Sequence, residues 1–269
     1  MQDLIREFEL YLYEKELAEN TIRCYIHHLK DYFSIYDEIS KVNLIEWKKR
    51  LTQRLIANSA NHYLSAMNEF LKFIGKHDLA LRKIKVQTRS SVENVISFEE
   101  FNKLLECLKQ DGNMKWYYII LILGKTGVRV NEVTKLKYGD LVRGYADIPT
   151  KGKIRRIYFC DSLRTEEIFN FYKDKKENDY LLENRFGEQI TRRGVAQQLQ
   201  NYAIKYNINP KVMHPHSFRH FFAIEFLKRD KDISLLADLM GHSSINTTTI
   251  YLRLNQQEQQ NRLSKAMDF

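Results

Sequence analysis

The chain has 269 residues, of which 43% are hydrophobic and 29% charged, and this leaves one large domain or two smaller ones open. Lys and Arg number 43 against 34 Asp and Glu, and the formal net charge of +9 fits a nucleic-acid partner as well as a solvated basic surface. Three widely spaced cysteines without a CxxC pair exclude a disulfide framework and a cysteine zinc site, so a reducing compartment is expected.

Neither a secretion signal nor a membrane span is predicted. The N-terminal stretch MQDLIREFELYLYEKE is charged throughout, unlike a signal peptide. No uncharged apolar run in the sequence approaches the ~20 residues of a membrane-spanning helix. With only 10 Gly and 3 Pro, the composition favours helices over a many-turned β fold. We therefore expect a mainly helical, cytoplasmic protein without a membrane partner.

Residues 1–85 contain four amphipathic segments, which predict a small helical bundle. Asn20 is a plausible N-cap for the second helix, and the fourth helix is expected to stop at Gly75. The bundle could be a generic helical adaptor or a module that grips DNA. The basic residues that favour DNA contact are Arg23, Lys30 and Lys72.

The stretch from 76 to 95 is basic and weakly periodic, and it reads as an extended connection between two modules. We place an N-terminal domain at residues 1–85, a linker at 86–96 and a second domain at 97–269. In the second domain, Ser97 and Glu100 form a capping box that opens a helix.

The apolar run 116–123 predicts a buried helix, which Gly124 and Gly127 are expected to break before another helix begins near Val128. Arg129 therefore lies at a helix start, among apolar neighbours. A guanidinium in such surroundings needs an anion, because burying it unpaired is costly. The anion could be a ligand, or a carboxylate of this chain, such as Glu132 or Asp140.

Two alternating runs, LVRGYADIP and IRRIYF, predict a β-hairpin with TKGK at its turn. Lys151 and Lys153 at the tip could act as a cationic finger or be solvated charges. Residues 163–175 predict another helix. Thr191 is expected to cap the next one, whose Arg192 and Arg193 suit phosphates and base edges, although an exposed surface helix would look similar.

The stretch from His214 to Tyr251 gathers polar side chains at helix edges. His216 and Arg219 are three residues apart and share a helix face. The next helix ends at Gly241, which places His242 just beyond it. The segment SSINTTTIY is expected to start a further helix that carries Tyr251.

Taken together, these residues are cations, hydrogen-bond donors and one phenol, without an acid pair, a Gly-rich phosphate loop or a metal cluster. Such a set suits attack on a phosphodiester without a metal ion. Cations stabilise the charge of the pentavalent phosphorane, and a tyrosine can serve as covalent nucleophile.

Four motifs follow the order and spacing of the tyrosine recombinase (phage integrase) family: TGVRVNEVTKL, TKGKIRR, HPHSFRHFFA and LMGHSSINTTTIY. The chain resembles compact, Xer-like members over nearly its whole length. The resemblance implies a mainly α fold, in which a SAM-like four-helix core-binding bundle precedes an α-rich catalytic domain with a small β-hairpin. The two domains are expected to form a C-shaped clamp on DNA.

The resemblance also implies which residues are catalytic, with no cofactor and no metal ion. They are two arginines, a lysine, two histidines and the nucleophile: Arg129, Arg219, Lys151, His216, His242 and Tyr251. Lys153 is the alternative to Lys151, because this turn is slightly shorter than in many members. Glu132 matches a commonly acidic position that helps to orient the site.

The implied reaction is site-specific DNA recombination through a 3′-phosphotyrosine intermediate, as in integration, excision, inversion or dimer resolution. The implied partner is double-stranded DNA carrying a recombination site, bound by a homotetramer. Two alternatives are a catalytically silent DNA-binding protein of this fold and a relaxing enzyme like the type IB topoisomerases. The tail after Tyr251 is expected to dock on a neighbouring protomer or to fray.

Overall fold

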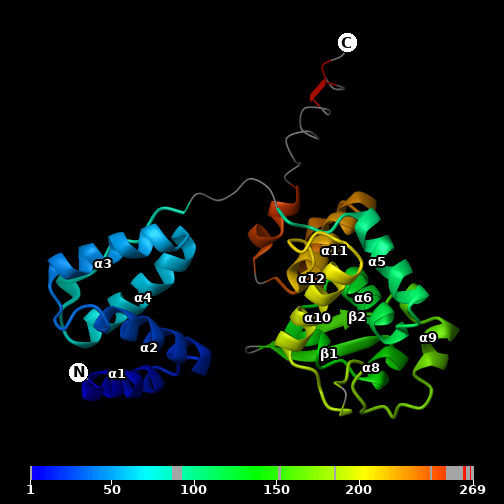
Figure 1. The fold of residues 1–269 in the computed structure, drawn as a ribbon, viewed down its shortest axis with the longest axis horizontal. Helices are drawn as coiled ribbons and strands as arrows, with labels where there is room; N and C mark the ends of the chain where they lie inside the picture. Colours follow the sequence, from blue (N-terminus) through cyan, green and yellow to red (C-terminus); the bar gives the residue numbers. More distant parts are fainter. Residues whose placement is uncertain are drawn as a thin grey trace. The chain divides into compact units, whose positions relative to one another are not determined.

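A computed structural model gives the fold of the chain (Figure 1) and describes residues 2–86, 93–150, 153–184, 186–242, 244–252, 263, 264 and 267. The chain divides into two compact units, Met1–Thr88 and Arg89–Phe269, each with a hydrophobic core of its own. No helix within those ranges is long and apolar enough to cross a membrane.

The N-terminal unit is the predicted helical bundle. Its helices, drawn in blue to cyan in Figure 1, are α1 (Gln2–Glu14), α2 (Glu19–Phe33), α3 (Lys41–Arg54) and α4 (Ala57–Phe73), followed by the 3-10 turn η1 (His77–Leu79). Gly75 follows α4 with a φ of 72°, a left-handed conformation that suits glycine, so the predicted helix stop is confirmed. Asn20 was wrong as a cap, because α2 already begins at Glu19 and Ala18 is its N-cap.

Trp47 of α3 fixes the centre of this unit. It is 1% exposed, and its ring meets Tyr32 of α2 edge to face at 5.3 Å between centroids. Its indole Nε1 donates a hydrogen bond to the Asp31 carboxylate over 3.0 Å, so the polar atom of the ring is satisfied inside the core. Trp47 therefore ties α3 to α2 by an aromatic contact and a hydrogen bond in the middle of the core.

The second unit is mainly helical as well, with one two-stranded sheet in its described part. Its helices are α5 (Phe98–Gln110), α6 (Met114–Thr126), α7 (Val130–Val133), α8 (Tyr138–Arg143), α9 (Glu166–Phe171), α10 (Arg192–Lys205), α11 (Pro215–Arg229) and α12 (Ile233–Met240). Its strands are β1 (Tyr145–Thr150) and β2 (Lys153–Tyr158), and its 3-10 turns are η2 (Asp161–Leu163), η3 (Ile245–Thr247) and η4 (Thr249–Leu252).

Helix α6 is the centre of the second unit and packs against both α5 and α11. The predicted buried helix is thus confirmed, but Gly124 does not break it. A Cβ at Gly124 would lie 2.5 Å from the ring of Phe101, so this glycine lets α5 approach closely while α6 continues to Thr126. Helix α6 ends at Gly127, which adopts a left-handed φ of 57°.

The predicted capping box of Ser97 and Glu100 and the Thr191 cap of α10 are both present. Helix α9 is shorter than predicted, since the segment from 163 to 175 is helical only over Glu166–Phe171. The turn η2 precedes it, so the apolar side chains of this segment reach the core from a turn as well as from a helix.

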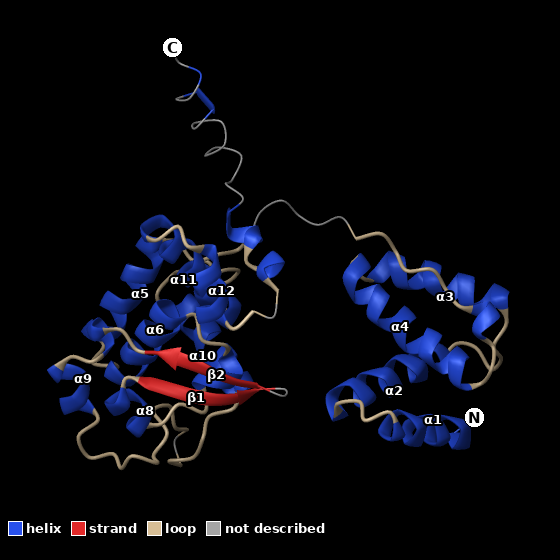
Figure 2. Ribbon diagram, turned by 180° about the vertical axis from the view of Figure 1, so that it is seen from behind, coloured by secondary structure: helices blue, strands red, loops and turns tan. Residues whose placement is uncertain are grey.

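The predicted β-hairpin is present as an antiparallel pair (Figure 2), with Tyr145 opposite Tyr158 and Thr150 opposite Lys153. This register leaves two residues for the turn, Lys151 and Gly152, which lie outside the described residues. Helix α8 packs on β1 and α12 contacts β2. Each strand of the hairpin is therefore in contact with a helix.

Leu64→Ala tests the core of the N-terminal unit. Leu64 is fully buried, so we expect the free energy of unfolding of this unit to fall by about 2–5 kcal/mol in urea denaturation. The matched control is Leu10→Ala, at a position that is 58% exposed, where the midpoint should hardly move. Equal losses in the two variants would contradict this account of the core.

Candidate active site

Arg129 is positioned by the turn that ends α6. A Cβ at Gly127 would lie 2.4 Å from the ring of Phe222, so only glycine fits where the chain turns toward α7. Arg129 is the N-cap residue of that short helix, which begins at Val130 rather than at the predicted Val128. Its Nη1 pairs with Glu132 over 3.1 Å, and its backbone N–H donates to the same carboxylate over 2.7 Å. The structural ion pair left open by the sequence is thus present, with Glu132 and not Asp140.

Arg155 of β2 shares the carboxylate of Glu132 and is the first residue of the site that the sequence interpretation missed. Its side chain is 5% exposed and that of Glu132 4%, and the two form an ion pair. A signal was available, because strand alternation puts Arg155 on the same face as the buried Ile157. A guanidinium on a core-facing position has to meet an anion.

Three guanidiniums of the described chain donate to consecutive carbonyl oxygens where α12 ends. Arg155 Nη2 donates to Leu239 O over 2.6 Å, and Arg219 Nη2 donates to Met240 O over 2.6 Å. Arg129 Nη2 donates to Gly241 O over 3.0 Å. The last carbonyls of a helix have no partner within the helix and carry partial negative charge. The arginines from β2, α11 and the α7 turn therefore meet at one helix end.

Arg219 is the most enclosed of the predicted catalytic arginines and is 5% exposed. Its Nη1 donates to Gly127 O over 2.5 Å, which ties α11 to the turn before Arg129. Burial lowers the pKa of Arg219 to about 9, with a further contribution from Arg129 and Arg155, so the group stays charged at neutral pH. A guanidinium has five N–H donors, and two protein contacts leave others for an anion.

His242 lies directly after the left-handed Gly241, as predicted. A Cβ at Gly241 would come within 2.5 Å of the Arg155 side chain, so this position is crowded as well as strained for other residues. His242 Nδ1 and the hydroxyl of buried Thr248 are 2.7 Å apart. Burial lowers the pKa of His242 to about 4, and Arg219 and Arg129 add to the effect, so the ring is neutral at pH 7.

Tyr251 lies in the 3-10 turn η4, where a helix was predicted. The run from Ser244 to Tyr251 forms the two turns η3 and η4, because its β-branched residues and Asn246 are weak α-helix formers. The ring of Tyr251 packs on a small cluster that includes Ala223, Leu236 and Met240. Its burial raises the pKa of the phenol to about 12 against the opposing effect of Arg219.

The hydroxyl of Tyr251 lies 2.7 Å from Nδ1 of His220 on α11. His220 is the second residue that the sequence interpretation missed, although it stands beside Arg219 in the motif. His216, one turn earlier on α11, is exposed, with its ring 6.5 Å from that of His220. The part of the His216 ring that is shielded from water, together with the charge of Arg219, lowers its pKa as well.

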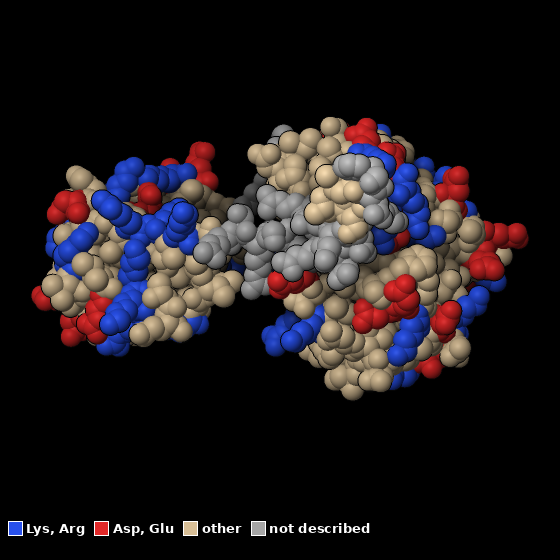
Figure 3. All heavy atoms as spheres, turned by 90° about the horizontal axis from the view of Figure 1, so that it is seen from above, with Lys and Arg blue, Asp and Glu red and all other residues tan. Residues whose placement is uncertain are grey.

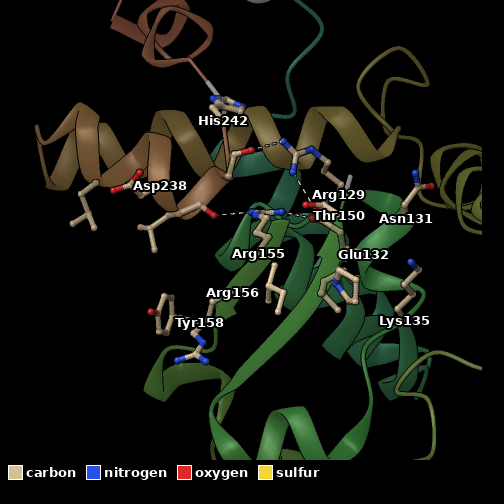
Figure 4. A pocket seen from close by; sticks show the side chains of 16 residues that line it. Arg129, Asn131, Glu132, Lys135, Thr150, Arg155, Arg156, Tyr158, Asp238 and His242 are labelled. Carbon is tan, nitrogen blue, oxygen red and sulfur yellow. Dashed lines mark hydrogen bonds and ion pairs between the residues drawn. The ribbon is translucent and has the colours of Figure 1, made fainter. Parts of the chain in front are cut away.

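A cavity with a volume of about 1140 Å³ lies between β1, β2, α7 and α12, and Arg129, Arg155 and His242 line it, whereas Arg219 and Tyr251 do not. Figure 4 shows Arg129 and Arg155 directed at the end of α12, with Glu132 between them and His242 at the rim. Lys151 belongs to the hairpin turn outside the described residues, whereas Lys153 is the first residue of β2. Within the described ranges, no group of three or more His, Cys, Asp or Glu is placed to hold a metal ion.

The residues predicted to contact DNA elsewhere lie on the surface. Arg23, Lys30 and Lys72 are exposed on the N-terminal unit, and Figure 3 shows basic side chains spread over one face of that unit. Arg192 and Arg193 are exposed in the first turn of α10. These side chains are accessible to a polyanion, whereas Arg129 and Arg155 in the cavity are fixed by hydrogen bonds to the end of α12.

Comparison with known proteins identifies the family. Residues 94–258 match the profile described as the phage integrase family, and residues 5–78 match its N-terminal SAM-like domain. The chain belongs to the phage integrase family. Its relatives include tyrosine recombinases, which cut and rejoin DNA. The predicted family, the mainly α fold with a SAM-like N-terminal domain and a small hairpin, and the enzymatic activity are therefore confirmed.

Relatives in the integrase family cover nearly the full length of the chain. Tyrosine recombinase XerA of Pyrococcus furiosus is 29% identical, with 98% of this chain and 94% of the relative aligned. The Tn1549 transposon integrase in complex with transposon right-end DNA has a TM-score of 0.75 at 16% identity over 99% of both chains. A lambda integrase tetramer bound to a Holliday junction gives a TM-score of 0.72 at 16% identity, covering 93% of this chain and 76% of that one.

Glu132→Gln tests the central ion pairs. The amide keeps the shape of the carboxylate but leaves Arg155 buried without a counterion, so we expect a loss of about 3–5 kcal/mol in the free energy of unfolding of this unit. The control is Asp147→Asn, which breaks the exposed pair with Arg156 and should leave the urea midpoint unchanged. A Glu132→Gln protein as stable as this control would show that the arginines do not depend on the carboxylate.

Proposed function

We propose that the catalytic set of this recombinase is Arg129, Lys151, His216, Arg219, His242 and Tyr251, acting on one phosphodiester of double-stranded DNA. The observation that carries the proposal is the meeting of Arg129, Arg219 and His242 at the end of α12, with the Tyr251 hydroxyl held at His220, the residue after Arg219 on α11. These side chains come from four separate elements. A purely structural network would not require a phenol beside them.

In this reaction the phenolic oxygen of Tyr251 forms a bond to the scissile phosphorus. The bond from phosphorus to the 5′ oxygen breaks with its electron pair, which leaves a 3′-phosphotyrosine and a 5′ oxygen that takes up a proton from Lys151. A 5′-hydroxyl of the partner strand reverses these changes and reseals the DNA. The covalent bond keeps the energy of the phosphodiester, so no other energy source enters the step.

Arg129 and Arg219 bind the non-bridging oxygens, since planar guanidiniums suit bidentate phosphate contacts. His242 donates a third hydrogen bond. In the tautomer whose Nδ1 accepts from the Thr248 hydroxyl, Nε2 carries the proton and is available to the phosphate. The exposed ring of His216 assists as a donor or acid–base group near the reacting atoms.

The remaining assignments concern DNA and assembly. Residues 1–85 act as a core-binding domain and 97–269 as the catalytic domain, joined by 86–96, and the two grip opposite faces of a duplex. The exposed Arg23, Lys30, Lys72, Arg192 and Arg193, together with Lys153, contact its backbone. Lambda integrase, of the same fold, is a tetramer on a Holliday junction, which supports an assembly of four copies of this chain on two recombination sites. We place the reaction in the cytoplasm and the tail after Tyr251 on a neighbouring copy.

Tyr251→Phe should abolish covalent DNA adducts and leave DNA binding intact, because it removes the nucleophilic oxygen alone. The substrate is selected from a library of nicked duplexes with randomised flanks. The wild type is incubated with the library, and the DNA in SDS-resistant protein–DNA complexes is sequenced to identify the duplex that it cleaves. Binding is measured by gel shift, and Tyr117→Phe in α6 is the matched control. Adducts formed by Tyr251→Phe would refute the assignment, and a wild type that binds duplexes without any adduct would indicate a silent DNA-binding protein.

Lys151→Ala should slow adduct formation on the captured duplex by about 100-fold or more, as expected for loss of a general acid. Lys153→Ala is the paired variant, two residues further along the same hairpin, and should keep most of the cleavage rate. Single-turnover rates distinguish the two. A selective loss in Lys153→Ala would move the acid to that position.

A further inference from the structure

We propose that His220 is the group that accepts the phenolic proton when Tyr251 attacks DNA. The inference rests on the proposed role of Tyr251 as nucleophile and goes beyond the set of six residues assigned above. It starts from one contact, the 2.7 Å distance between His220 Nδ1 and the Tyr251 hydroxyl. This is the distance at which a general base meets the proton it removes.

Several elements fix the relative position of the two side chains. His220 lies on α11 directly after Arg219, whose guanidinium is anchored at both Gly127 O and Met240 O. The turn η4 packs against the same helix, and the two rings lie 5.5 Å apart between centroids at an angle of 52°. The tilted rings form a contact between polar edges, so the pair is more than a stacking arrangement.

In the resting site the imidazole is free to accept a proton and the phenol keeps its own, so the transfer has to accompany bond formation to phosphorus. Burial, with the nearby His216 and His214, lowers the pKa of His220 to about 4, so at neutral pH the ring is uncharged and one nitrogen can accept a proton. The buried phenol of Tyr251, with its pKa raised to about 12, is ionised to only about one part in 10⁵ at pH 7. A phenol held so firmly in its neutral form needs a base in contact with it.

The other histidines of the site are less suited to this task. His242 directs Nδ1 at the Thr248 hydroxyl. His216 lies one turn from His220 with its ring exposed. Within the described part of the chain, His220 is the hydrogen-bond partner of the Tyr251 hydroxyl. The base is therefore assigned to the residue already in contact.

In the step itself, the O–H bond of Tyr251 breaks and its proton moves to Nδ1 of His220 while the phenolic oxygen bonds to phosphorus. The imidazolium forms near Arg219, and the negative charge that develops on the phosphorane offsets the repulsion between the two cations. In the resealing step the departing phenolic oxygen takes the proton back. The base is restored after each cycle without another reactant.

Two substitutions separate proton acceptance from mere orientation. In His220→Asn the side-chain oxygen can take the place of Nδ1 and accept a hydrogen bond, but it is not basic, and His220→Ala removes both properties. We expect both variants to form adducts about 100-fold more slowly than the wild type, or slower still, with DNA binding retained. The matched control is His214→Asn, because Asn can replace His214 as the N-cap of α11 and should keep the wild-type rate.

The substrate is the duplex recovered by covalent capture, resynthesised with sulfur in place of the bridging 5′ oxygen. A thiolate leaves without a proton, so Lys151→Ala should regain its rate on this duplex, whereas the His220 variants should stay slow. Wild-type speed in His220→Asn, or recovery of the His220 variants on the sulfur duplex, would overturn the proposal. Adducts formed by Tyr251→Phe would instead show that the assigned nucleophile is wrong.

A measurement on the unsubstituted protein covers the case in which the variants fold poorly. With ¹⁵N-labelled histidine, Nδ1 of His220 should resonate as an unprotonated nitrogen at pH 7, and its shift should change in Tyr251→Phe. A protonated Nδ1 at this pH would overturn the proposal, since the nitrogen could not take the phenolic proton.

Discussion

The ion pairs of Glu132 with Arg129 and Arg155 are the contact on which the site depends. Glu132 accepts from both guanidiniums and from the backbone N–H of Arg129, and its side chain is only 4% exposed. Without this carboxylate, the arginines of the α7 turn and of β2 would repel each other across a shared buried position. It therefore joins the hairpin to the loop that carries Arg129, the first of the proposed catalytic arginines.

The end of α12 provides the second constraint. Carbonyl oxygens orient the guanidiniums of Arg129, Arg155 and Arg219 but do not neutralise them. Among the described residues, Glu132 is the carboxylate that pairs with these arginines, so three guanidiniums share one paired carboxylate and can still meet a phosphodiester. A second carboxylate would have held the arginines equally well and would have repelled the substrate. The structure thus fixes the positions of these guanidiniums and leaves their positive charge available to an anionic ligand.

Sequence motifs predicted the helical fold, the hairpin and the turn after Gly241, because glycine stops, capping boxes and strand alternation are local signals. They did not predict Arg155 or His220, since the roles of these residues depend on which distant segment packs against them. The helix expected before Tyr251 was wrong for a related reason. The β-branched run forms two 3-10 turns, of which η3 packs against α12 and η4 against α11, and only this tertiary contact brings the phenol to His220.

Gly127 and Gly241 have a consequence for how this protein can change. Each sits at a left-handed turn where an added methyl group would collide with a neighbour, Phe222 in one case and Arg155 in the other. Neither glycine has a functional group to offer the reaction. In a saturation screen for recombination, these two positions should nevertheless tolerate as few replacements as the proposed catalytic side chains. Positions that tolerate no substitution in this enzyme will therefore include the turns that position the site as well as the residues that react.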